Sequence, residues 1–356
     1  MRRFSKLAIS TAAGVLAVGA LTVHSESATA KPGGAPKTGV GAVFMVNPVQ
    51  SSGNQGLTDQ KDAARAVPGS AYAEVPLRNL DGSGYLRGKW VVVKSATGAP
   101  AYSARSRYFY DRQQDQFEQV MGYFWVNQAQ EYLQSLGFGA PGSGLPGIIK
   151  QPFTVKINQY GGDNSYQTSK PYRIRLGKGG VDDAEDAEVI VHEYGHAVHQ
   201  SQVPGYGQSI DAGAIGESFG DYLAVTVGLD AAGDYGWPVR AEEACPMDWD
   251  ATSYTAAPHC IRRFDRDLTL DQRRNQVHFD GQIWSQALWE IRLGYEDLGL
   301  STEDWDTTLI ASQFDYAPGT SFQDAAETTY EYALARDGAA AAALVREKFA
   351  DRGITF

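Results

Sequence analysis

The sequence predicts an α+β fold of two lobes, in which an N-terminal mixed sheet precedes a mostly helical C-terminal lobe. Three observations predict this class. Strand-like runs with alternating apolar residues lie before residue 180, whereas segments with apolar residues at helical spacing dominate after residue 205. In addition, 43% of the 356 residues are hydrophobic and 21% are charged, which suits a globular protein with a sizeable core.

The charge balance argues against a nucleic-acid-binding protein. The chain carries 42 acidic and 31 basic residues, a formal net charge of −11, whereas nucleic-acid binding needs a basic surface. An acidic balance of this size suits an exported protein or one that binds cations. We therefore expect no nucleic acid among its partners.

The first 30 residues are typical of an export signal. Three basic residues precede an apolar stretch over residues 7–23, and Ala28-Thr29-Ala30 supplies the small residues that precede cleavage. The alternative is a retained single-span anchor, for which the apolar stretch is short. We expect residues 1–30 to be removed and the mature protein to be secreted, with no membrane association.

The cysteine content agrees with export. Cys245 and Cys260, the only cysteines, lie fifteen positions apart. In an oxidising compartment the simplest interpretation is a disulfide that closes this loop, and the alternative is a pair of free buried thiols.

Residues 31–107 are predicted to be rich in β-structure. Strand-like runs cover residues 41–49, 71–77 and 85–93, and the turn sequence Asp81-Gly82-Ser83-Gly84 suggests a hairpin between the last two.

Residues 108–205 are predicted to form an α/β lobe. A helix is expected within residues 108–136, because its apolar residues recur at helical spacing, and strands are expected over 153–158 and 172–176. A second helix is expected over 182–200. Its acidic start suits the positive end of the helix dipole, and calcium binding is the alternative interpretation of these acids.

Residues 206–356 are predicted to form the helical lobe. Apolar periodicity predicts helices over residues 213–228, 275–294, 302–315, 322–337 and 339–350.

The second helix of the α/β lobe contains the motif HExxH. His192 and His196 are four positions apart, so both imidazoles face the same side of the helix. Two imidazoles suit Zn²⁺, and Glu193 can reach water beside the metal. The alternative is a helix that binds no metal and carries two exposed histidines. His199 is expected at the surface.

A catalytic zinc needs a third protein ligand and an open coordination position. Glu217 lies 21 positions after His196 on another predicted helix, and Asp221 follows one turn later on the same face. We therefore predict that His192, His196 and Glu217 bind zinc and that Asp221 orients a ligand histidine.

These two helices identify a family resemblance. The segments HEYGHAVHQ and GAIGESFGDYLAV resemble the zinc helix and the glutamate helix of the gluzincin zinc metallopeptidases, the thermolysin-like and especially the fungalysin-like branch. The likeness runs from about residue 108 to the C-terminus. It implies a thermolysin-like two-lobed metallopeptidase.

The resemblance also suggests further site residues. Val277-His278 resembles a helix start whose histidine donates to the oxyanion of the tetrahedral intermediate, and Arg262 resembles an arginine that binds a substrate carbonyl. Tyr206 is a candidate second oxyanion donor. Asn164 resembles the substrate-binding edge of the sheet, although a simple turn is equally consistent with that segment.

The sequence thus predicts a secreted, monomeric zinc metalloendopeptidase that acts on proteins or peptides, with Glu193 as general base for a zinc-activated water. A zinc aminopeptidase and a catalytically silent, zinc-stabilised binding protein remain as alternatives. The calcium sites of thermolysin do not map onto this sequence, so Ca²⁺ stays open as a second cofactor.

Overall fold

The computed structural model describes residues 37–356, and the predicted export signal lies outside them. Within these residues the first sheet has the order β2-β1-β4. Strand β1 (Lys37–Phe44) pairs antiparallel with β2 (Tyr72–Leu80) and parallel with β4 (Arg107–Tyr108). The run predicted over 41–49 ends early as a strand, because the side chain of Asn47 caps helix α1 (Pro48–Ser52).

The second sheet has the order β3-β5-β7-β6. Strands β3 (Val91–Ser95), β5 (Phe153–Ile157) and β7 (Tyr172–Arg175) are parallel, and β6 (Tyr166–Ser169) pairs antiparallel with β7 at the sheet edge. The hairpin predicted at Asp81–Gly84 is limited to one antiparallel bridge, between Leu80 and Gly88. Strand β3 does not continue this pairing, because β2 and β3 belong to different sheets.

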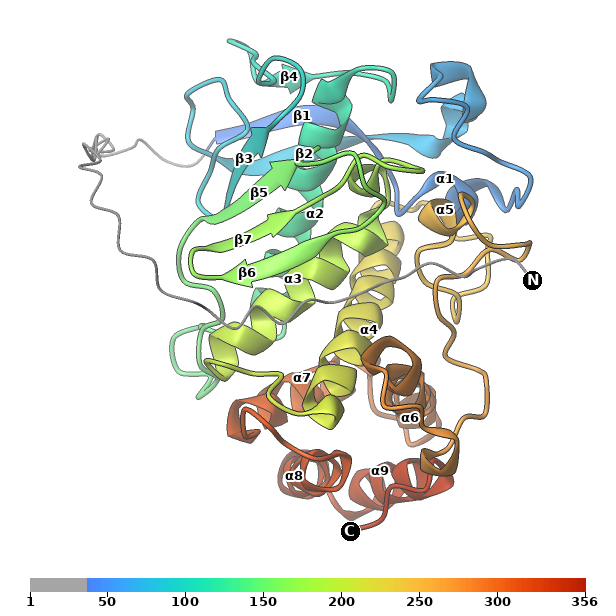
Figure 1. Cartoon of the computed structure of the whole chain (residues 1–356). Helices are drawn as coiled ribbons and strands as arrows, with labels where there is room; N and C mark the ends of the chain where they lie inside the picture. The colour runs from blue at the N-terminus through green and yellow to red at the C-terminus, as the bar shows by residue number, and fades with distance from the viewer. Residues whose placement is uncertain (1–36) are drawn as a thin grey trace, which may run out of the picture. The chain divides into compact units, whose positions relative to one another are not determined.

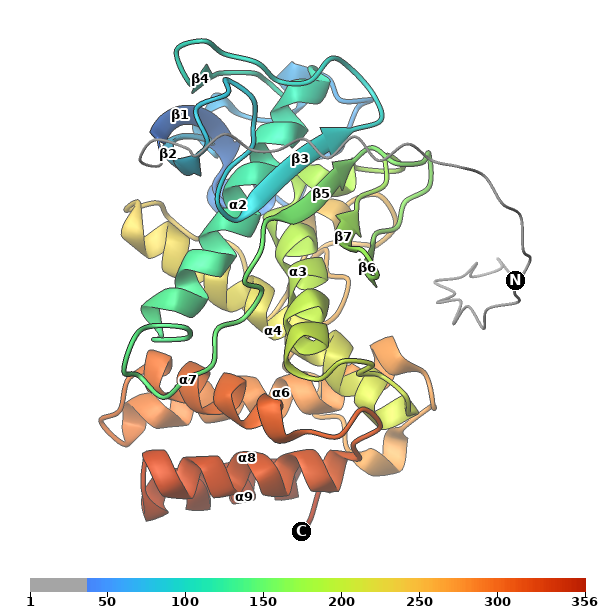
Figure 2. The same ribbon diagram turned by 90° about the vertical axis from the view of Figure 1, so that its left-hand side faces the viewer.

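Helices α2 and α3 pack against the second sheet (Figures 1 and 2). Helix α2 (Asp115–Ser135) buries residues on every side because both sheets and α3 contact it. Helix α3 (Ala187–Gln202) begins later than predicted. The acidic residues expected in its first turn form a buried 3₁₀ turn, η3 (Asp183–Glu185), and Asp186 caps the helix.

Helix α4 (Ile210–Asp234) crosses α3 and leads into the helical part (Figure 2). It is buried along most of its length, between α3 and α6 (Val277–Asp297). The other helical elements are α5 (Asp248–Ala251), α7 (Thr302–Ser312), α8 (Phe322–Arg336), α9 (Ala339–Asp351), and the 3₁₀ turns η1 (Ala64–Ala66), η2 (Gly69–Ala71), η4 (Leu270–Gln272) and η5 (Gln313–Asp315).

The predicted α+β class is confirmed, with sheets in the N-terminal part and helices in the C-terminal part. The disulfide between Cys245 and Cys260 is also confirmed. Within residues 37–356 no helix is long and apolar enough to cross a bilayer. The division at residues 107/108 and 205/206 stays a prediction; the first boundary falls inside β4 and the second between α3 and α4.

Candidate metal centre

Helices α3 and α4 approach each other closely at two glycines, Gly195 and Gly220. A Cβ atom added to Gly195 would lie 2.9 Å from Cα of Gly220, and one added to Gly220 would lie 2.6 Å from Nδ1 of His192. Only glycine permits so close an approach of two helix backbones. Neither glycine was predicted as a site residue, although the glycines that flank Glu217 in the sequence were the available signal. This crossing places Glu217 opposite the two histidines.

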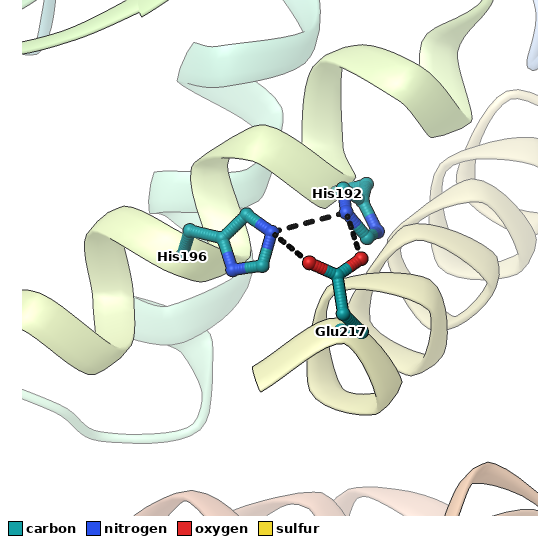
Figure 3. A group of neighbouring side chains, drawn as sticks. All are labelled: His192, His196 and Glu217. Atoms are coloured by element: carbon teal, nitrogen blue, oxygen red, sulfur yellow. Dashed lines mark hydrogen bonds and ion pairs between the residues drawn. The ribbon is translucent and has the colours of Figure 1, made fainter. Parts of the chain in front are cut away.

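The three predicted ligands converge on one point (Figure 3). The Nε2 atoms of His192 and His196 are 3.1 Å apart, and each lies 3.5 Å from a different oxygen of Glu217. Atoms bound to one tetrahedral zinc at about 2.0–2.1 Å are separated by about 3.3 Å. The donor set therefore fits zinc in both chemistry and spacing.

Burial also indicates that a cation belongs here. Glu217 is 5% exposed and Glu193 is 6% exposed, yet Oε2 of each finds no hydrogen-bond donor within residues 37–356. An unpaired buried carboxylate oxygen is costly unless a cation compensates it. Burial raises the pKa of Glu193 to about 8, whereas the imidazoles of His196 and His192 outweigh burial at Glu217 and hold its pKa well below the usual value.

Asp221 lies where the sequence places it. Its Oδ1 is 2.8 Å from Nδ1 of His192, so the His192 Nδ1–H can donate to it and leave Nε2 free to bind a metal. The guanidinium of Arg262 donates to both Asp221 oxygens, each at 2.5 Å. Burial raises the pKa of Asp221, but the Arg262 charge more than offsets this and the pKa is lowered. The Asp221 carboxylate therefore stays ionised. This pairing of Arg262 with Asp221 was not predicted from the sequence, which suggested only that Arg262 binds a substrate carbonyl.

His278 faces the metal centre from the first turn of α6. Its Nε2 is 3.3 Å from Oε2 of Glu217, and the Gln276 side-chain amide lies 2.8 Å from its Nδ1. Because Oε1 of Gln276 caps the helix through the Phe279 N–H, its amide nitrogen must face His278. The neutral ring then accepts at Nδ1 and carries its proton on Nε2, toward the ligands.

Tyr206 and His199 lie next to the zinc-binding group, near Gly216 of α4. The Tyr206 ring and His196 both border Gly216, but the Tyr206 hydroxyl is buried with no partner in the described part of the chain. His199 is 1% exposed and its ring packs between Tyr206 and Phe219. The expectation of a surface His199 is therefore wrong, because α4 covers that face of α3.

Asn164 is exposed in the loop that precedes the edge strand β6. No contact links its side chain to the metal ligands in the described structure. Strand β6 has a paired neighbour, β7, on one side only, and it packs beside α3. The edge that an extended peptide would need is therefore present next to the zinc helix.

Comparison with known proteins agrees with this site. The family model of the fungalysin metallopeptidases (M36) matches residues 169–312. Extracellular metalloproteinase 1 of Phaeosphaeria nodorum is 25% identical over 48% of this chain and 30% of its own length, so the chain spans less than a third of this curated relative. The precursor of protealysin, a metalloproteinase from Serratia proteamaculans, superposes with a TM-score of 0.49 at 17% identity, over 67% of this chain and 79% of that chain. Residues 169–312, which match the model of the fungalysin metallopeptidase family, contain all three members of the zinc-binding group, in agreement with the resemblance of the two helices.

Proposed function

We propose that this chain is a secreted zinc-dependent metalloendopeptidase. One observation carries the proposal: His192, His196 and Glu217 converge beside a buried, unpartnered Glu193 in a segment of the fungalysin family. Zn²⁺ bound there supplies a Lewis acid and lowers the pKa of a coordinated water. Burial favours the neutral form of Glu193, which makes its carboxylate a good acceptor for the proton of water. The same group then donates this proton to the leaving amine.

Three other side chains are assigned roles in this proposal. The Nε2–H of His278 donates to the oxyanion, and Asp221 fixes the tautomer of His192. Arg262 binds a substrate carbonyl through Nη1, because Nε and Nη2 are engaged by Asp221. Tyr206 as a second oxyanion donor needs a rotation of its buried ring, and Asn164 binds peptide backbone beside β6.

Zinc removal tests the proposal. Treatment with a zinc chelator is expected to abolish hydrolysis of casein by the purified chain, and added Zn²⁺ is expected to restore it, with one zinc bound per chain. Activity that is indifferent to the chelator would overturn the proposal. Cleavage only next to a free amino terminus would favour the aminopeptidase alternative, and zinc binding without any cleavage would favour the binding protein.

Replacing His278 by Gln separates oxyanion binding from metal binding. We expect kcat to fall by about 10²–10³-fold, the usual loss for one oxyanion donor, with the KM and bound zinc nearly unchanged. Steady-state kinetics on a short peptide and metal analysis measure these quantities. A kcat within about threefold of the wild type would remove His278 from the oxyanion site.

We also propose a structural Ca²⁺ at Asp186, Glu188 and Asp248. Oxygens of these three buried carboxylates lie within 4.8 Å of one another, and both Asp248 oxygens are without a hydrogen-bond donor in residues 37–356. Calcium is expected to raise the melting temperature of the wild type by more than that of Asp248→Asn, because Ca²⁺ stabilises only a site that can bind it. Equal shifts in both proteins would contradict this site.

Secretion and a monomeric state complete the proposal. The Cys245–Cys260 disulfide suits an oxidising compartment, and the similar fungal protein is named extracellular. Detection of the mature chain in culture medium, starting at residue 31, checks the first expectation. Sedimentation analysis of the purified chain checks the second.

A further inference from the structure

A second group of acids lies away from the zinc ligands, at the N-terminal end of the edge strand β6. Asp163 precedes β6, Asp183 belongs to η3, and Asp250 belongs to α5. One carboxylate oxygen from each lies within 4.8 Å of the other two. Three segments that are distant in sequence therefore direct acidic groups toward one point.

No basic side chain neutralises this group within the described residues. Lys178, on the same loop as Asp183, pairs with Asp182 at 2.9 Å instead. Asp183 is 2% exposed and Asp250 is 4% exposed, and Oδ1 of each has no hydrogen-bond partner in residues 37–356. Clustered, unpaired and buried carboxylates are strongly destabilising unless protons or a cation neutralise them.

The remaining oxygens of Asp183 and Asp250 are held by the protein. Oδ2 of Asp183 accepts from the Gly177 N–H at 3.2 Å and from the Ser165 hydroxyl, and Oδ2 of Asp250 accepts from the Tyr254 hydroxyl at 2.9 Å. Each carboxylate is therefore fixed through one oxygen while the other stays available. Hydrogen bonds that orient carboxylates in this way are typical of metal ligands.

The chain also closes tightly around Asp163. Gly180 has φ of +75°, and a Cβ atom there would lie 2.5 Å from Oδ2 of Asp163 and 2.9 Å from Oγ of Ser253. A larger residue at position 180 would push these oxygens apart. Asp163 and the Ser253 hydroxyl, which accepts from the Val181 N–H at 2.8 Å, therefore approach the same side of Gly180.

We propose that Asp163, Asp183 and Asp250 bind one Ca²⁺, which fixes the N-terminal end of the substrate-binding edge strand. All the available donors are oxygens, which Ca²⁺ prefers, and its six to eight coordination positions are completed by waters or carbonyls. The site is separate from the Asp186, Glu188 and Asp248 group, although α5 contributes one aspartate to each.

The position of this ion links it to substrate binding. Asp183 is bonded to Ser165, which lies between Asn164 and the first residue of β6. Without the ion, repulsion among the three carboxylates would loosen this loop and raise the KM more than it lowers kcat. This consequence rests on the proposed peptidase function, whereas cation binding itself does not.

Terbium luminescence tests the binding site without any substrate. Tyr254 is hydrogen-bonded to Asp250, so its excitation is expected to sensitise Tb³⁺ bound to the zinc-loaded protein, and Ca²⁺ is expected to displace that signal. Asp163→Asn should weaken this binding by at least about tenfold. Asp248→Asn, in the other acidic group, is the matched control and should retain it. Asp163 reaches the surface, so its variant is expected to fold even if Asp250→Asn does not.

Peptide kinetics in zinc-buffered solution test the consequence. Removal of Ca²⁺ from the wild type is expected to raise the KM by about tenfold with kcat within about twofold, and Asp163→Asn should show the raised KM with or without Ca²⁺. Equal Ca²⁺ affinity in wild type and Asp163→Asn would overturn the site and would mean that protons neutralise the acids. Loss of Ca²⁺ binding with an unchanged KM would overturn the link to substrate. Normal Ca²⁺ binding in a chain that cleaves no peptide would instead refute the proposed peptidase function.

Discussion

Replacing Glu193 by Gln is expected to lower kcat by about 10³–10⁴-fold, near the upper end of what a general base contributes, while one zinc stays bound. Glu193 lies beside His192 on α3, is 6% exposed, and carries an oxygen without a hydrogen-bond partner in residues 37–356. Gln has the same shape but cannot accept the proton of water. Steady-state hydrolysis of a short peptide, together with metal analysis of the variant, measures both quantities.

The matched control is Glu296→Gln at the exposed end of α6, which makes the same chemical change away from the site. Its kcat is expected to equal that of the wild type. If Glu193→Gln kept a kcat within tenfold of the wild type with zinc bound, another group would be the base. If the variant lost zinc, the assignment of Glu193 as a group that does not bind the metal would be wrong.

Replacing Arg112 by Met is expected to destabilise the protein by about 3–5 kcal/mol, the usual cost of leaving one member of a buried ion pair without its partner. The side chains of Arg112 and Glu185 are both fully buried, and they approach to 2.6 Å. Arg112 also pairs with Asp59 at 2.6 Å. Its removal leaves the Glu185 carboxylate desolvated in the turn that precedes α3. Urea unfolding of the folded chain measures the loss.

The matched control is Arg78→Met, because Arg78 pairs with Glu131 at the same distance but is 38% exposed. A loss of at most about 1 kcal/mol is expected there, since solvent screens partly exposed pairs. The double variant Arg112→Met with Glu185→Gln should recover part of the lost stability, because it removes the unpaired charge. An Arg112 variant as stable as the Arg78 variant would show that the buried pair is not a stabilising connection.

The metal ligands were predictable from sequence to different degrees. His192 and His196 share a helix, so their spacing alone places both imidazoles on one face. Glu217 comes from a different helix, and its approach depends on Gly195 and Gly220, whose contact is set by tertiary packing. The Arg262 pairing with Asp221 joins positions 41 residues apart, and no local pattern indicates it.

The errors have the same origin. The Asp81–Gly84 sequence has suitable turn residues, but β3 pairs with β5, some 60 positions later, rather than with β2. The acids before α3 look like a helix start because their spacing is local, yet Asp183 accepts from Ser165, 18 positions away, and Glu185 accepts from Arg112, 73 positions away. His199 is polar and lies on a helix, and only the position of α4 shows that it is covered.

The contact of Gly195 with Gly220 sets a condition for moving this metal centre to another scaffold. A graft that copied only His192, His196 and Glu217 onto two ordinary helices would hold them too far apart, because Cβ atoms at the two glycine positions would lie within 2.9 Å of the facing helix and force it away. The transferable unit is therefore the pair of helices with both glycines in register. Zinc affinity in such a graft would be controlled by two residues that have no side chain to offer the metal.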